Sequence, residues 1–226
     1  MHNGYISDFQ KIKRQMSNAM SQEAYEHIQG STDTEHFAAL LMSFLCIGAA
    51  RNPSTSNEDT AIPGAEDYHS AAQIRDALKQ TISTIIKIQQ EVLGPNSQPN
   101  DLNIAVTDGK SLVACRFRNH VTEQPPSLYY STQAGVTLNR MFPDHPDGAN
   151  GPHGSAKDHS QGGAHGAEGH NPYAKKSAGE HGKHVIIASE PTTYKAKEWT
   201  LVEKNRMVLV GSDGEIVIEE VDYLRK

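Results

Sequence analysis

Apolar positions in the first half of the chain recur with the period of an α-helix. Residues 34–49 place apolar side chains at i, i+3, i+4, i+7 and i+8, which predicts a helix whose inward face is Phe37, Leu40, Leu41, Phe44 and Leu45. The same period over residues 69–93 and over residues 9–20 predicts two more helices. Gly94-Pro95 ends the longer of them. Stripes of this kind indicate helices packed on a core rather than a cofactor site.

The period changes from 3.6 to 2 after residue 100. Leu102, Ile104 and Val106 alternate with small or polar residues, which predicts a strand that turns at Asp108-Gly109. Further strands are expected at 112–117, 127–131 and 185–188, in a hairpin of 200–202 with 207–210, and after Asp213-Gly214, where Ile216, Ile218 and Val221 recur. Helices and antiparallel strands in separate blocks predict an α+β fold.

Two segments lack such periodicity. Residues 51–68 are rich in Ser, Thr, Asn, Pro and Gly and are expected to form a loop. Residues 143–183 consist mainly of Gly, His, Ala, Pro and Ser, so they cannot bury enough apolar surface to offset their ordering entropy. We expect a disordered insertion there. Its histidines, among them His145, His153, His159, His165, His170 and His181, could bind a metal, but without cysteine partners or a rigid element only weak, adventitious binding is expected.

The composition of the chain argues against several classes of function. A chain of 226 residues is expected to form one domain with insertions. The net charge of −6 and the lack of a basic stripe argue against a nucleic-acid partner. No apolar run is long enough for a membrane span, and the polar first residues argue against a signal peptide. Cys46 and Cys115 both lie in apolar segments, which favours reduced thiols in a cytoplasmic protein.

Polar, turn-forming residues precede the first and second helices. Asn3 lies beside Gly4, and a side-chain amide next to an approachable backbone N–H suits an oxyanion hole, although Asn-Gly is commonly only a turn. Asp33 begins the second helix, where a fixed carboxylate could hold a substrate ammonium group. Thr32 with Glu35 predicts a capping box at this helix, and Ser7 is expected to cap the first.

These segments resemble a known family. His2-Asn3-Gly4 followed by Gly30-Ser31-Thr32-Asp33-Thr34-Glu35-His36 is similar to the class II glutamine amidotransferases, and the resemblance extends over residues 1–46, 69–142 and 184–222. It implies that Asn3 and Gly4 form the oxyanion hole and that Asp33 binds the amino end of a glutamyl substrate.

Two later segments resemble one subgroup of that family. Residues 102–109 and 184–191 are similar to the subgroup of the ergothioneine-pathway amidohydrolase and the fungal DUG amidotransferase subunit, which acts on glutathione. The resemblance implies that the loop with Ser189 and Glu190 lines the substrate pocket. With Thr32 and Asp33, these residues are the candidate substrate-binding residues.

The resemblance also implies a fold and a reaction. The complete fold would be the four-layer αββα sandwich of N-terminal nucleophile hydrolases. The reaction would be hydrolysis of a γ-glutamyl amide, with glutathione or another γ-glutamyl compound as substrate. The expected partner is the peptidase-like subunit of a DUG-type complex. No cofactor or metal is needed for the amidase step.

The sequence departs from the family in one respect. The family nucleophile is a Cys at the mature N-terminus, upstream of the His-Asn-Gly segment, whereas this sequence begins at Met1. We therefore expect the domain to be incomplete at its N-terminus and to lack its first strands. Cys115-Arg116 cannot substitute, because an internal cysteine has no α-amine to act as base. Whether Arg116 is buried near the active site stays open, and a non-catalytic scaffold subunit is the alternative function.

Overall fold

The computed structural model describes residues 1–50, 68–134, 184–193 and 195–223. The chain divides into two compact units, one formed by residues 1–128 with 201–226 and the other by residues 129–200. Together they contain helices and antiparallel strands, which confirms the predicted α+β class. The predicted insertion 143–183 lies outside the described residues, and so does the predicted loop 51–68 except for Tyr68.

Three helices of the first unit lie close to the predicted ranges: α1 (Phe9–Asn18), α3 (Asp33–Ala50) and α4 (Ala71–Leu93). The short α2 (Gln22–Glu26) lies between α1 and α3, and the short η1 (Gly94–Asn96) follows α4. Ser70 and Gln73 form a reciprocal capping box at the start of α4. Gly94 ends this helix with φ 59°, a conformation that glycine adopts without steric cost. None of the described helices combines the length and apolarity that a bilayer crossing requires.

The start of α1 differs from the prediction. Ser7 does not cap the helix, because its hydroxyl donates to the Pro99 carbonyl and its N–H donates to the Asn100 side chain at 2.9 Å. Asp8 is the N-cap residue instead, with φ 54° and no side-chain cap bond. Ser7 is buried, so its polar groups are used to join the start of α1 to the segment that enters the sheet.

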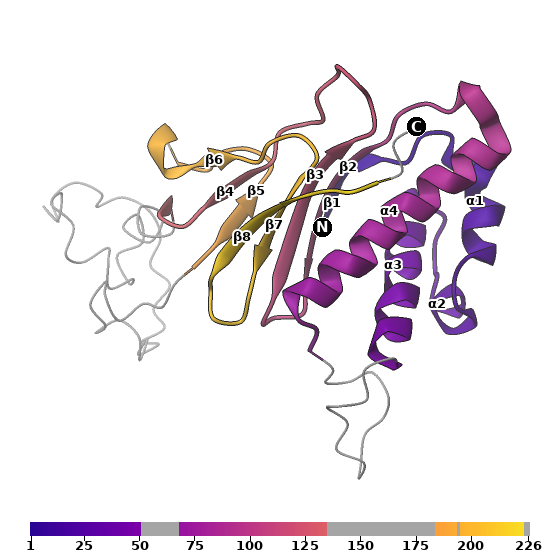
Figure 1. Cartoon of the computed structure of the whole chain (residues 1–226), viewed down its shortest axis with the longest axis horizontal. Helices are drawn as coiled ribbons and strands as arrows, with labels where there is room; N and C mark the ends of the chain where they lie inside the picture. The colour runs from indigo at the N-terminus through magenta and orange to yellow at the C-terminus, as the bar shows by residue number, and fades with distance from the viewer. Residues whose placement is uncertain (51–67, 135–183, 194, 224–226) are drawn as a thin grey trace, which may run out of the picture. The chain divides into compact units, whose positions relative to one another are not determined.

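One antiparallel sheet of five strands, in the order β1-β2-β3-β7-β8, forms the centre of the first unit. Figure 1 shows α1, α3 and α4 on one side of this sheet. The strands are β1 (His2–Tyr5), β2 (Asp101–Thr107), β3 (Leu112–Arg118), β7 (Arg206–Val210) and β8 (Ile216–Glu220). Because β1 and β8 are the edge strands, each offers one side of its backbone for other contacts.

The cross-strand register shows which residues lie on each face of the sheet. Ile104, Cys115 and Met207 are aligned, and all three belong to the core that packs on the helices. The next row, Asn103, Arg116 and Arg206, therefore faces the other way, because side chains alternate along a strand. The helices complete the core with the residues predicted for it, which include Phe37, Leu40, Leu41, Leu45, Ile74, Leu78, Ile82, Ile85 and Ile86, with Phe44 half-buried against them.

The predicted hairpin of residues 200–210 is wrong. β6 (Thr200–Leu201) belongs to a second, three-stranded sheet of order β5-β4-β6, with β4 (Tyr129–Ser131) and β5 (Ile186–Ala188), and follows the short η3 (Ala196–Glu198). β7 instead pairs with β3 in the first sheet. Asn205, with φ 58°, lies at this change of sheet, and its N–H donates to the Arg116 carbonyl at 2.8 Å. Asparagine tolerates this left-handed conformation better than most residues, so a turn signal here did not mean a hairpin.

Candidate active site

The outer edge of β1 carries backbone groups that β2 does not use. Met1 and Ala105 exchange two backbone hydrogen bonds, of 2.7 and 2.9 Å, and β1 continues from this pair in antiparallel register. Bonded and non-bonded pairs alternate in such a ladder, so Asn3 and Tyr5 bond to β2. The N–H and C=O of Gly4 consequently point away from β2, toward the open side of the strand.

Gly4 is held in a conformation that only glycine fits. Its φ is 146°, and a Cβ at this position would lie 2.0 Å from the Asp101 carbonyl oxygen. A side chain would therefore both strain the backbone and force β1 away from β2. The close contact with Asp101 fixes the position of the Gly4 N–H, as a preorganised oxyanion donor requires.

The side chain of Asn3 lies on the sheet face that the helices do not cover. Asn3 is exposed and pairs with Asn103, which in turn pairs with Arg116. Arg116 is buried, and it shares a cross-strand row with Asn3. Its guanidinium donates to the carbonyls of Pro125 and Pro126 at 2.8 Å and of Val202 at 3.0 Å. Arg116 therefore has a structural role, because these bonds hold the loop that covers its strand.

Asp33 lies next to the open edge of β1. One of its carboxylate oxygens accepts from the Ile6 N–H at 2.8 Å, and the other accepts from the Thr34 N–H at 2.8 Å. Ile6 follows Gly4 by two residues, a spacing of about 7 Å along an extended strand. The structure therefore brings Gly4 and Asp33 to the same edge, and each carboxylate oxygen keeps a lone pair for a further donor.

Thr32 and Glu35 form only half of the predicted capping box. The Thr32 hydroxyl accepts from the Glu35 N–H at 3.3 Å, as predicted. The Glu35 carboxylate instead accepts from the N–H groups of Gln29 and Gly30, and these bonds lower its pKa. Glu35 thus fixes the turn before α3, and Thr32, which is exposed, stays a predicted substrate contact.

Sequence patterns did not reveal two contacts that fix this site. The first is the Ile6 N–H bond to Asp33, and the second is a contact of His2 Nδ1 with Thr34 Oγ1 at 2.8 Å. Both connect residues that lie about thirty positions apart, so no local pattern could have shown them. Ser189 and Glu190 belong to the second unit, on the turn after β5, and their role stays a prediction.

Neither cysteine is placed to attack a substrate at Gly4. Cys115 is completely buried on the helix-covered face, and burial raises the pKa of its thiol. Its thiolate, the reactive form, is therefore scarce. Cys46 is exposed on α3, but thirteen residues of helix separate it from Asp33, which is about 20 Å. A nucleophile at the Gly4 edge must come from outside these two residues.

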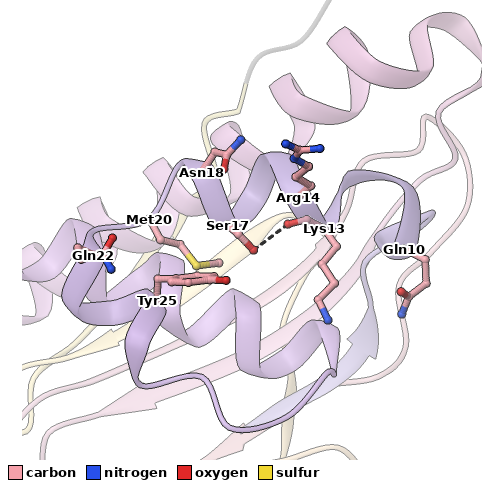
Figure 2. A pocket seen from close by; sticks show the side chains of 8 residues that line it. All are labelled: Gln10, Lys13, Arg14, Ser17, Asn18, Met20, Gln22 and Tyr25. Atoms are coloured by element: carbon pink, nitrogen blue, oxygen red, sulfur yellow. Dashed lines mark hydrogen bonds between the residues drawn. The ribbon is translucent and has the colours of Figure 1, made fainter.

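Two surface hollows lined by described residues of the first unit can be compared with the candidate site. One, of about 840 Å³, lies beside α1 and α2, and Figure 2 shows Lys13 and Arg14 pointing away from each other along it. None of the candidate site residues lines that hollow. The other, of about 470 Å³, begins at Tyr5 and Ile6, directly after Gly4. The described residues contain no group of three or more His, Cys, Asp or Glu side chains suited to a metal ion.

Comparison with known proteins gives two similarities. The chain is 27% identical over 212 residues to "Probable glutamine amidotransferase DUG3" of Saccharomyces cerevisiae, a match that covers 93% of this chain and 48% of that protein. It is also similar in structure to a glutamine aminotransferase class-II domain protein from Silicibacter pomeroyi, with a TM-score of 0.56 and 19% identity over 97% of this chain and 65% of that one. No protein-family model matches the sequence.

These similarities establish the type of fold. The chain spans about half the length of its curated relative and about two thirds of its structural neighbour. The structural neighbour is a glutamine aminotransferase class-II domain protein, and the structural match extends over 97% of this chain. At 19% identity this match concerns the fold alone.

Proposed function

We propose that the chain forms the oxyanion-binding and amine-binding part of a class II glutamine amidotransferase site, which hydrolyses a γ-glutamyl amide. The observation that carries the proposal is the common edge of β1, where the outward N–H of Gly4 and the carboxylate of Asp33 lie about two residues apart. The match to a curated glutamine amidotransferase over 93% of the chain supports it. The complete four-layer αββα sandwich belongs to the same proposal.

In this proposal each group has its own task. A thiolate from outside Cys46 and Cys115 attacks the γ-carbonyl carbon, and the carbonyl oxygen takes up the negative charge. The Gly4 N–H and the Asn3 side-chain amide donate to this oxyanion. Asp33 holds the α-ammonium of the glutamyl group. The leaving nitrogen takes up the proton that the thiol gave to a base when the thiolate formed, so the amine leaves neutral. Water then cleaves the thioester to release glutamate and regenerate the thiol.

Substrate and partner are parts of this proposal. Glutathione or another γ-glutamyl compound is the proposed substrate, and the peptidase-like subunit of a DUG-type complex is the proposed partner. The resemblance of residues 102–109 and 184–191 supports both. Thr32, Ser189 and Glu190 are the further proposed substrate contacts. The positions of the two thiols favour one alternative, a non-catalytic subunit that keeps the amidotransferase fold for assembly.

Binding to the chain itself tests the proposal. L-glutamine should bind in titration calorimetry, and glutaramate, which lacks the α-amine, should bind about tenfold or more weakly because it cannot pair with Asp33. Asp33→Asn should remove this difference, whereas Asp222→Asn, a matched change at an exposed carboxylate, should preserve it. Equal affinity of the wild-type chain for both ligands would exclude the amine-binding role.

Activity measurements distinguish the proposed enzyme from the alternative, a non-catalytic scaffold subunit. In the longest natural form of the protein, Asn3→Ala should lower kcat for glutamate release about a hundredfold with little effect on ligand affinity, as loss of one oxyanion donor does. Residues 1–226 alone should bind glutamine without hydrolysing it. Glutamate release by this chain that disappears on Cys115→Ala would show that the nucleophile is internal. Absence of turnover in every natural form would favour the scaffold.

A further inference from the structure

The β1 strand is attached to α3 at two points, one on each side of Gly4. Asp33 accepts from the Ile6 N–H, two residues after Gly4, and Thr34 contacts the His2 ring, two residues before it. Asp33 and Thr34 are neighbours in the first turn of α3. Four residues of strand are therefore held by two consecutive residues of one helix.

The His2 side chain is built into this junction. Register places it on the helix-covered face with Ile104, and its ring stacks on Phe37 with centroids 6.0 Å apart and planes 24° from parallel. Its Nδ1 lies 2.8 Å from Thr34 Oγ1, where the hydroxyl can accept or donate according to the tautomer. Its Nε2 is buried and has no hydrogen-bond partner among the described residues.

We infer that His2 is a positioning residue that must be neutral to hold the Gly4 N–H and the Asp33 carboxylate in register for a γ-glutamyl ligand. This inference rests on the proposed function. A protonated ring would place a charge and a second N–H in a buried setting, where the Asp33 carboxylate and the Asp101 backbone offset only part of the lost hydration. The ring would then turn toward water and release Thr34.

The surroundings of the His2 ring favour its neutral form. Burial is the main cause that lowers the pKa of His2, and the Met1 ammonium acts in the same direction. The Asp33 carboxylate and the Asp101 backbone oppose these effects without cancelling them. Because the pKa in the folded chain lies below the ordinary value of 6.5, the contribution of His2 is complete above pH 6.5 and declines as the pH falls below it.

The test compares ligand affinity across pH in the wild-type chain and three variants. For the wild-type chain, affinity for L-glutamine should fall several-fold between pH 7.5 and 5.5. His2→Asn can keep a hydrogen bond to Thr34 without titrating, so it should bind within about threefold of the wild type and lose the pH dependence. His2→Leu should bind about five- to tenfold more weakly at both pH values. His27→Asn, at the exposed histidine that follows α2, should retain the wild-type profile.

A second measurement does not depend on the ligand. If His2 positions the junction, amide exchange at Ile6 should be faster in His2→Leu than in the wild type, while exchange at Leu209 in the same sheet stays unchanged. A wild-type pH profile in His2→Asn, or unchanged Ile6 exchange in His2→Leu, would overturn the inference. If the wild-type chain binds no glutamine, the proposed function fails and Ile6 exchange alone decides whether His2 positions β1.

Discussion

The two edge strands of the five-stranded sheet, β1 and β8, are shaped by different demands. β1 is fixed residue by residue: Gly4 touches the Asp101 carbonyl, and side chains of α3 hold the strand on both sides of it. β8 leaves Val217 and Ile218 half exposed, at 52% and 50%. The β1 edge, which carries the candidate site, is held in exact backbone positions, whereas the β8 edge, which carries none of the candidate residues, needs only protection from unwanted pairing.

Charged side chains provide that protection at β8. Glu219 pairs with Arg75 at 3.0 Å and with Lys79 at 3.7 Å, both on α4. Glu220 follows it, so the strand ends with two acidic residues. The predicted last strand with Ile216 and Ile218 is present as β8, where Ile218 is half exposed, and Val221, directly after the strand, is fully buried. Single substitutions at the two edges should therefore have very different effects.

The largest effect is expected for Gly4→Ala. The new Cβ would meet the Asp101 oxygen and would also force a left-handed backbone on alanine, so we expect a loss of about 2–4 kcal/mol in the free energy of unfolding. Glutamine binding should be lost with it. Gly109→Ala is the matched control, since its φ is 91° but nothing lies within 4 Å of the new Cβ.

Chemical denaturation of both variants distinguishes the steric clash with Asp101, which only Gly4→Ala has, from the backbone strain of a positive φ, which both variants share. Gly109→Ala should lose only about 1–2 kcal/mol, the cost of the left-handed conformation, and should bind glutamine normally. If the two variants were equally stable, the contact between Gly4 and Asp101 would have no energetic importance.

A smaller effect is expected for Arg75→Met at the other edge. It removes a partly exposed partner of Glu219 and should lower the free energy of unfolding by at most about 1 kcal/mol, without changing glutamine affinity. Lys87→Met, which removes an exposed pair with Glu91 at 3.9 Å, should have no measurable effect. Weaker glutamine binding in Arg75→Met would show that the β8 edge also supports the site.

The smallest effect is expected for Ile218→Thr. Threonine keeps the branched Cβ that strands favour, and the side chain is half in solvent, so the free energy of unfolding should change by no more than about 0.5 kcal/mol. The same change at Ile104, which is 3% exposed, should lower the thermal midpoint by many degrees, because a hydroxyl would enter the core. Similar midpoints for both variants would contradict the contrast between edge and core.

Local patterns predicted the elements of this chain better than their pairing. The helical stripes of α3 and α4 were correct because each helix buries a single face, which periodicity reports directly. The hairpin at 200–210 was wrong because neighbouring strands in sequence can join different sheets, and no local signal specifies the partner. Ser7 failed as a cap because a distant acceptor, the Pro99 carbonyl, competes for its hydroxyl.

The same distinction applies to the candidate site, where some residues could be predicted from the sequence and others could not. Asn3, Gly4 and Asp33 could be named from the sequence because a family resemblance marks them, and the structure places Gly4 and Asp33 at one edge. The junction of His2 with Thr34 could not be predicted, since it depends on how β1 and α3 meet in space. Whether Ser189 and Glu190 contribute also depends on tertiary arrangement, which sequence spacing does not encode.

The contact between Gly4 and Asp101 also selects how β1 aligns with β2. Sliding β1 by one residue would exchange the faces of Asn3 and Gly4 and would turn the Gly4 N–H inward. It would also bring Asn3 or Tyr5 over the Asp101 oxygen, where no Cβ fits. The absence of a side chain at Gly4 therefore selects the correct alignment of the two strands during folding. A misaligned β1 cannot close against β2, so chains that complete the sheet are those in which the candidate site is correctly oriented.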